Sequence, residues 1–364
     1  REQKGWPHPE EAGKPAADVL QALGKFEATM AELTKAAKER PQCRYDIKYE
    51  AHFGALLPHL AIYKKFVTSF TLRALAHLGN DDPESALADI RMCLFLDETI
   101  SDEPFLISQL VRIACLNIAL GPVWEGLREE KWNAEQLATI EKQLATIDLL
   151  EGYRISILAE RDFANLMIDQ NHDLPKLMRL LVEDDDVSPA VRFMFPDGWF
   201  YQNQRRLNEM HVNFSQRIVD SKARRIYPDI AGAFNKELHK KRNLPIFDIL
   251  SSILLPALDK AARKIGSAQT TVDHARIACH LELHKLKHKI YPAKLADLEA
   301  PLPHDPYTGK PYVYKPDPKG RYQLYGVGWN QKDDGGKVVL KDNGRLNLEK
   351  GDLVWGYSHQ PAPK

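Results

Sequence analysis

Long hydrophobic runs, net charge and recognisable catalytic motifs are all missing from this chain, and each absence excludes a class of protein. The longest apolar stretch, Ile249 to Leu258, contains two serines and Pro256 and is too short to cross a bilayer. Fifty basic residues balance fifty acidic ones, so no overall field draws the chain to nucleic acid or anionic lipid. The chain has no nucleophile elbow, P-loop, dinucleotide-binding glycine motif or kinase signature. The sequence therefore indicates no enzyme class.

Cysteine is scarce, and its spacing excludes two kinds of site. The four cysteines form no C-x-x-C pair, which argues against a zinc ribbon and against a thioredoxin-type redox centre. Cys93 and Cys115 lie in apolar helical patterns, where we expect buried free thiols rather than a disulfide. For Cys43 and Cys279 the sequence leaves the disulfide state open.

The chain begins at Arg1 without a methionine. Removal of a signal peptide or membrane anchor would explain this start, and a simple truncation would explain it equally well. The first explanation predicts a periplasmic or membrane-anchored extracytoplasmic protein. Within the chain itself we expect no transmembrane segment.

Hydrophobic periodicity predicts a mainly α fold in three parts: a loose lead-in over 1–15, an all-helical domain over 16–255 and an α+β module over 256–364. Two helix starts carry recognisable caps, Asp82 before Pro83 and Asn133 three residues before Gln136. After a break that contains an acidic run at 183–186, we expect a further helix and then an irregular basic stretch. The expected helical segments are 16–39, 61–78, 84–96, 103–120, 134–147, 150–171 and 199–221, with 222–245 irregular.

The last hundred residues have a different sequence pattern from the rest of the chain. Apolar residues at steps of three and four predict one long helix over 256–289 with a single buried seam, ended by Tyr291-Pro292. A short leucine-rich helix is expected over 293–298, and glycine- and proline-containing turns then separate short β-type runs. These runs are 312–314, 322–325, 338–340 and 353–355. The pattern predicts a long helix packed on a small antiparallel sheet.

The order of motifs in this region resembles the globular domain of the type II secretion major pseudopilin. In that family a helix ends in Y-P, an L-P-x-D-P-x-G-x-P-Y stretch leads into the sheet, and an acidic, glycine-rich loop follows a strand. Here these motifs correspond to Tyr291-Pro292, to 302–312 and to 324–336. The equivalent helix lacks the apolar N-terminal segment through which pseudopilins polymerise, so we expect a related fold without that assembly.

More of the chain is similar to a family of uncharacterised proteins from planctomycete- and verrucomicrobium-type bacteria. The shared features are the A-Q-T-x-V-D-x-A-R-x-A-C helix at 268–279, the V-G-W-N-x-x-D-D-G-G loop at 327–336 and the closing G-D-x-V-W at 351–355. The aromatic and amide-rich segment 198–204 is also shared. This resemblance points to related proteins but implies no enzymatic reaction.

The acidic loop is the leading candidate for a bound ion. The pseudopilin resemblance implies calcium held by Asp333, Asp334 and Asp352, with Asn330 as a helper, since hard cations prefer oxygen ligands. The alternative is a solvated turn in which the aspartates bond local backbone amides. The loop is not an EF-hand, because Lys332 occupies the third ligand position.

Three histidines, His280, His284 and His288, recur every four residues on one helix face, a spacing that suits a transition metal. Neighbouring lysines would repel a cation, so we interpret them as surface histidines beside the buried seam. Arg112 and the run Glu160-Arg161-Asp162 fall inside helical patterns, where we expect ion pairs.

Aromatic and amide groups gather at Trp199, Tyr201, Gln202 and Asn203 and could form a ligand or partner surface. The preferred interpretation of this segment is a helix start that buries its aromatic rings. The basic stretches 222–225 and 239–242 could contact phosphates, but without interleaved aromatics a solvated surface is the preferred interpretation.

Two functional hypotheses follow. The first is a non-catalytic extracytoplasmic scaffold or protein-interaction protein, with a protein as its partner. The second is an enzyme or small-molecule-binding protein with a pocket in the helical domain. A large pocket with convergent buried polar groups would favour the second, and a filled helical core with an exposed apolar groove would favour the first.

Overall fold

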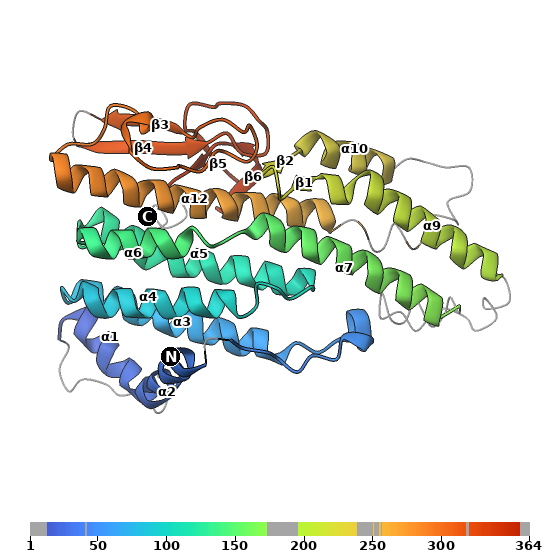
Figure 1. The fold of residues 1–364 in the computed structure, drawn as a ribbon, viewed down its shortest axis with the longest axis horizontal. Coiled ribbons are helices and arrows are strands. Elements are labelled where there is room, and N and C mark those ends of the chain that lie inside the picture. Colours follow the sequence, from blue (N-terminus) through green and yellow to red (C-terminus); the bar gives the residue numbers. More distant parts are fainter. Residues whose placement is uncertain are drawn as a thin grey trace.

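The fold is mainly helical with small antiparallel sheets, which confirms the predicted fold class at this level (Figure 1). The computed structural model describes residues 13–40, 42–172, 196–238, 250, 255, 257–317 and 320–356. The acidic run 183–186, the basic stretch 239–242 and most of the lead-in lie outside these residues. The described α-helices are α1 (Pro15–Leu23), α2 (Glu27–Glu39), α3 (Pro58–Gly79), α4 (Pro83–Glu98), α5 (Leu106–Arg128), α6 (Ala134–Leu144), α7 (Leu149–Gln170), α9 (Asp197–Asn213), α10 (Pro228–Leu238) and α12 (Leu258–His288).

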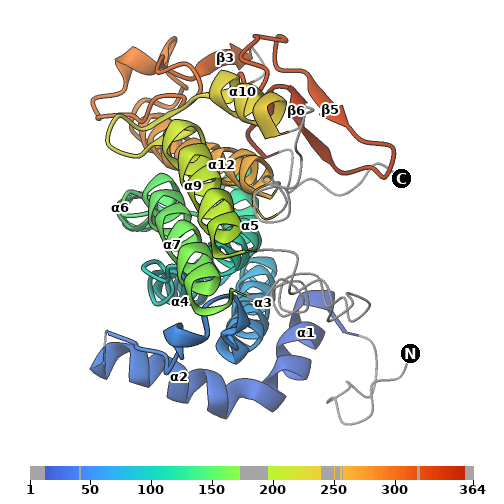
Figure 2. The same cartoon turned by 90° about the vertical axis from the view of Figure 1, so that its right-hand side faces the viewer.

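Helices are stacked in layers, with the C-terminal strands at one end of the stack. Figures 1 and 2 show α1 and α2 at the opposite end, followed by α3 with α4, then α5 with α6, and then α12 under the strands. One hydrophobic core runs from the α3 layer to the strands and includes Ala74 of α3, Leu116 of α5, Ala275 of α12 and Leu353 of the C-terminal strands. The C-terminal region and the helical region therefore share buried apolar surface, which is the main favourable term in folding.

Local capping fixes two helix starts as predicted. The Asp82 carboxylate accepts a hydrogen bond from the Ser85 amide at 3.1 Å, so α4 begins at Pro83. Asn133 and Gln136 bond each other's backbone amides at 2.9 and 3.1 Å, which is the reciprocal capping box at the start of α6. Each cap supplies partners to amides that have none within the helix.

The long helix α12 is buried on more than the single seam that its apolar stripe predicted. Polar side chains such as Gln269, Asp273 and His274 are also buried, because α5, α6 and α7 cover one side of α12 and the strands cover another. Gly266 allows α12 to approach Tyr307 and Ile226 closely, since a Cβ at this position would collide with both side chains. An apolar stripe predicts burial on one helix face only, so it does not predict that a second face of α12 is also covered.

The C-terminal strands do not form the one sheet that the sequence predicted. Strands β3 (Val313–Asp317), β4 (Arg321–Gly326) and β7 (Leu353–Val354) make an antiparallel sheet in that order, while β5 (Val338–Leu340) pairs with β6 (Leu346–Gly351). Strand β6 was missed, although its alternating Leu346 and Leu348 are a strand signal. The short helix predicted at 293–298 is a single 3₁₀ turn, Leu295–Asp297.

The segment after α9 was also predicted incorrectly. Instead of a helix to 221 and an irregular stretch to 245, α9 ends at Asn213, a hairpin of β1 (Val219–Asp220) and β2 (Arg225–Ile226) follows, and α10 comes next. The hairpin depends on the C-terminal region, since the Ile226 amide bonds the carbonyl of Pro306 at 2.8 Å. Such a long-range contact overrides local propensity and leaves no local signal.

Helix α5 is the one described helix that is long and apolar enough to cross a membrane, and 61% of its apolar window is buried inside the molecule. It is tied to α4 by a buried ion pair, in which Arg112 Nε donates to Asp97 Oδ2 at 2.9 Å. Both side chains are buried, so this ion pair lies inside the packed helices. The predicted pairing of Arg112 is thereby confirmed.

Candidate functional site

A cleft of about 430 Å³ lies between α5, α12 and the C-terminal strands. We call it the α5–α12 cleft. Its volume falls within the range of small-molecule sites, and most of its wall is apolar, as in such sites generally. The side chains that line it come from three elements distant in sequence: Leu110, Ile113, Ala114 and Asn117 of α5; Lys264, Ser267, Ala268, Thr271 and His274 of α12; and Arg345, Leu346, Leu348, Leu353, Val354, Trp355 and Gly356.

The α12 side of the cleft is a straight row of small and polar residues. Lys264, Ser267, Thr271 and His274 follow one another at steps of three and four, so they share one helix face. At 1.5 Å of rise per residue, Lys264 and His274 lie about 15 Å apart along the helix axis. The α5–α12 cleft is therefore elongated, with a cationic residue at one point of its wall and an imidazole at another.

His274 is the unusual residue of this wall. Its side chain is only 1% exposed, and its Nε2 has no hydrogen-bond partner. The ring contacts Tyr312 edge to face at 4.7 Å between centroids. Burial lowers the pKa of His274 to about 3, so the imidazole is neutral at physiological pH. A buried polar nitrogen without a partner costs about 1–3 kcal/mol, which makes this position a poor choice for stability alone.

A hydrogen-bonded network fixes the helix turn that carries His274. Asp273 accepts hydrogen bonds from Tyr312 Oη and Gln269 Nε2, both at 3.0 Å, and Arg224 lies 3.4 Å away. Burial raises the pKa of Asp273 to about 6, and the nearby Arg224 guanidinium opposes this shift. The network joins α12 to β3 and to the β1–β2 hairpin, so the wall of the cleft is held rigidly.

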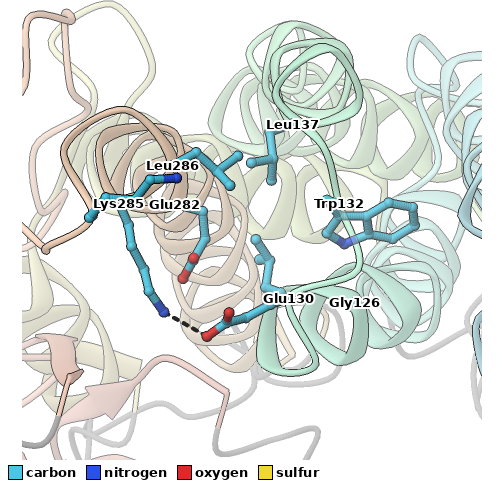
Figure 3. A pocket seen from close by; sticks show the side chains of 9 residues that line it. Gly126, Glu130, Trp132, Leu137, Glu282, Lys285 and Leu286 are labelled. Carbon is cyan, nitrogen blue, oxygen red and sulfur yellow. Dashed lines mark hydrogen bonds and ion pairs between the residues drawn. The ribbon is translucent and has the colours of Figure 1, made fainter.

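A second cavity, of about 160 Å³, lies where the ends of α5 and α12 meet the start of α6. Figure 3 shows Lys285 reaching to Glu130, with Glu282 pointing into the same space. These groups already have partners, since Lys285 Nζ is 2.6 Å from Glu130 Oε1 and Tyr291 Oη donates to Glu282 at 2.5 Å. This cavity is small and its polar groups are satisfied, so it is a weaker candidate than the α5–α12 cleft.

A third, open and more polar cleft of about 720 Å³ lies beside Tyr45 and Glu103. Glu103 accepts a hydrogen bond from Ser108 Oγ at 2.5 Å, and its other oxygen is 2.7 Å from His59 Nε2. The carboxylate thus separates the serine from the histidine, whereas nucleophile activation needs the histidine in contact with the hydroxyl. Tyr45 stacks on His59 at 4.1 Å between ring centroids. Glu103 therefore holds Ser108 and His59 in place, and His59 does not activate Ser108 as a nucleophile.

The acidic loop brings together the aspartates predicted to bind calcium, and local hydrogen bonds engage them. The buried Asp352 accepts bonds from the amides of Asp334 and Gly336 at 3.2 and 2.6 Å. Asp333 accepts from Tyr325 Oη at 3.0 Å and from the Gly335 amide at 2.9 Å. Asn330 Nδ2 donates to Asp334 at 2.8 Å. This geometry matches the turn alternative, and calcium binding stays a prediction.

The other predicted site residues are separated by the fold. Trp199 and Asn203 are buried, and the Asn203 amide bridges the Trp199 carbonyl and the Leu250 amide at 3.1 and 3.2 Å. Tyr201 and Gln202 are exposed, so the predicted ligand or partner surface is reduced to these two side chains. Segment 199–203 does not line the α5–α12 cleft.

The three histidines near the end of α12 contact different groups. His280 Nε2 is 3.5 Å from Glu141, and His284 Nδ1 is 3.0 Å from the Ile290 carbonyl. The rings of His284 and His288 lie 4.4 Å apart. Across the described ranges, no group of three histidine, cysteine or acidic side chains is arranged to hold a metal ion. All four cysteines are free thiols, and Cys93, Cys115 and Cys279 are buried.

The two arginines of the basic stretch 222–225 are engaged within the molecule, while Lys222 and Ala223 are exposed. Arg225 donates to the carbonyls of Pro306 and Tyr307, both at 3.2 Å, and Arg224 approaches Asp273 and Asp148. These internal contacts correct the solvated interpretation for Arg224 and Arg225 only. They also remove two of its charges from contact with an outside phosphate.

No protein-family model matches the chain, and neither a curated protein nor a solved structure shows significant similarity to it. The resemblances proposed from motifs therefore stay predictions. The α5–α12 cleft has almost no signature in the sequence. The one usable signal is that Gln269 and Asp273 directly follow Ala268 and Val272 of the apolar stripe, so their polar side chains border the buried seam.

Proposed function

We propose that this protein binds a small, largely apolar ligand in the α5–α12 cleft. The observation that carries the proposal is the cleft itself, a mostly apolar hollow of about 430 Å³ with the imidazole of His274 among the few polar side chains of its wall. Enclosed apolar cavities with a few polar groups are the usual form of small-molecule sites.

The architecture supports the same proposal. The wall is formed by two long helices and paired strands, and the network around Asp273 immobilises the turn next to His274. A preformed site loses little conformational entropy when it binds. The site lies between the helical layers and the C-terminal strands rather than within the helices alone.

The test is a fluorescence titration with N-phenyl-1-naphthylamine, an uncharged apolar dye. We expect saturable binding that Ala114→Trp abolishes, because Ala114 is an exposed residue of the wall and an indole there would fill the cleft. Ile107→Trp is the matched control, since Ile107 is exposed on the same helix and does not line the cleft. Equal binding by the two variants would contradict the proposal.

A protein-interaction role is the second candidate, and exposed apolar side chains near the start of α5 favour it. Tyr49 stacks against Phe105, which stacks against Phe163. Around them Phe53 is 38% and Leu56 85% exposed, an unusual display of large apolar groups. An extracytoplasmic location and a pseudopilin-like C-terminal module belong to this candidate, and both depend on the sequence motifs alone.

Photo-crosslinking from position 56 in cells tests this candidate. We expect one discrete protein adduct that is absent when the same photoreactive residue replaces the exposed Lys260. The same adducts from both positions would count against a specific partner surface.

A further inference from the structure

The charges around the α5–α12 cleft are all of one sign. Lys264 of α12 and Arg345, which immediately precedes β6, are the charged side chains of the wall, and no carboxylate lines it. Both are exposed, and neither makes an ion pair within the described part of the chain. By contrast, the adjacent Arg263 pairs with both Asp259 and Glu349.

Unpaired cations beside an apolar cavity favour an anionic group on the ligand. Two positive side chains without a counter-ion raise the local concentration of anions, and a partly enclosed apolar wall strengthens the attraction. Charge-assisted hydrogen bonds from lysine or arginine to a carboxylate are about twice as strong as neutral ones. The long alkyl stems of these side chains can also cover an apolar ligand body.

The remaining polar groups of the wall suit an uncharged part of the ligand. His274 is neutral and can offer one donor or one acceptor. Asn117 of α5 also lines the cleft, and its side chain makes no hydrogen bond within the described residues. Ser267 and Thr271 add hydroxyl groups, and the rest of the wall is mainly apolar, with four leucines and the indole of Trp355.

We propose that the ligand of the α5–α12 cleft is an amphipathic acid, with an elongated apolar body along the row from Lys264 to His274 and an acid group paired with the basic side chains of the wall. This proposal rests on the proposed binding function. It adds the chemical class of the ligand. The cleft would then discriminate between an acid and its uncharged analogue.

Dodecanoate and dodecanol are the probes, because they share an apolar chain and differ in the acid group. Each is used to displace N-phenyl-1-naphthylamine from the full chain. We expect dodecanoate to compete about tenfold more effectively than dodecanol, the size of one charge-assisted contact. The double variant Lys264→Gln with Arg345→Gln should lose this preference and still bind the dye.

A control variant with the same change in net charge, Lys260→Gln with Lys341→Gln, should keep the preference, since both lysines are exposed and outside the cleft. Equal competition by the two probes on the unmodified protein would overturn the amphipathic-acid proposal while leaving the binding function intact. A preference that survives in the Lys264 and Arg345 double variant would also overturn it. Failure of the dye to bind at all is the separate outcome that rejects the binding function.

Discussion

At the scale of single residues, His274 is one of several buried polar side chains with an atom that lacks a hydrogen-bond partner in the described chain; His52, Tyr63 and Thr270 are others. Buried histidines usually have partners, as His211 does, with its Nδ1 2.9 Å from Ser215 Oγ. His274 Nε2 has none. Positions that break local rules without a structural benefit are where functional residues are expected. The account therefore predicts that His274 reduces stability.

Replacing His274 by phenylalanine should raise the free energy of unfolding by about 1–2 kcal/mol, because the unpaired nitrogen disappears and the ring contact with Tyr312 is kept. Urea unfolding at pH 7 measures this. His211→Phe is the matched control, and it should destabilise, since it removes a satisfied hydrogen bond. Destabilisation of similar size in both variants would show that His274 is an ordinary core residue.

Glu160 is a half-buried polar residue with few partners. It was predicted to form an ion pair, yet its carboxylate accepts only the Leu106 amide, at 3.4 Å, among the bonds of the described chain. The neighbouring Arg161 pairs with Asp162 at 2.8 Å. Burial raises the pKa of Glu160 to about 7 from 4.5 in the unfolded chain.

Between pH 4.5 and about 7 the folded state thus holds a proton that the unfolded state has lost, and stability falls as the pH rises through this window. Glu160→Gln mimics the protonated form. Its advantage over the parent should be absent at pH 4 and grow to an order of 3 kcal/mol above pH 7.

Unfolding curves across this pH range test the Glu160 prediction, with Glu151→Gln in the same helix as the comparison. Bonding to Arg154 lowers the pKa of Glu151, so that variant should instead lose a little stability near neutral pH. A pH-independent effect of Glu160→Gln would show that its carboxyl is not desolvated.

At the scale of secondary-structure elements, the features predicted correctly from the sequence are those set by contacts between residues close together in the chain. Helices α4 and α6 begin where their caps Asp82 and Asn133 stand, because a capping side chain bonds amides only two or three residues away. The β1–β2 hairpin was missed because Ile226 and Arg225 bond Pro306, some eighty residues further along the chain. The α5–α12 cleft was missed for the same reason, since its walls meet only after the layers pack.

The acidic loop between β4 and β5 also belongs to this scale. The loop places Asp333, Asp334 and Asp352 together, and we keep the proposal that they bind calcium through oxygen ligands. Calcium should then raise the melting temperature relative to chelator, since a ligand that binds only the folded state stabilises it. Asp334→Asn should reduce the rise. A melting temperature unmoved by either addition would leave the loop as a hydrogen-bonded turn.

At the scale of the whole molecule, α12 joins the helical layers to the C-terminal strands. One core continues from α3 to β7 through this helix. The α5–α12 cleft lies at that junction, so both regions contribute to its wall. The C-terminal region therefore has a role in the proposed function that a separately folded appendage would not have.

The most direct test of the binding site is a crystal structure of the full chain grown with dodecanoate. The account predicts density for the acid in the α5–α12 cleft, with its chain against Leu346 and Trp355, its carboxylate at Lys264 or Arg345, and His274 in its wall. Density for the acid only at other sites, or an α5–α12 cleft filled by rearranged side chains of the protein itself, would contradict the account.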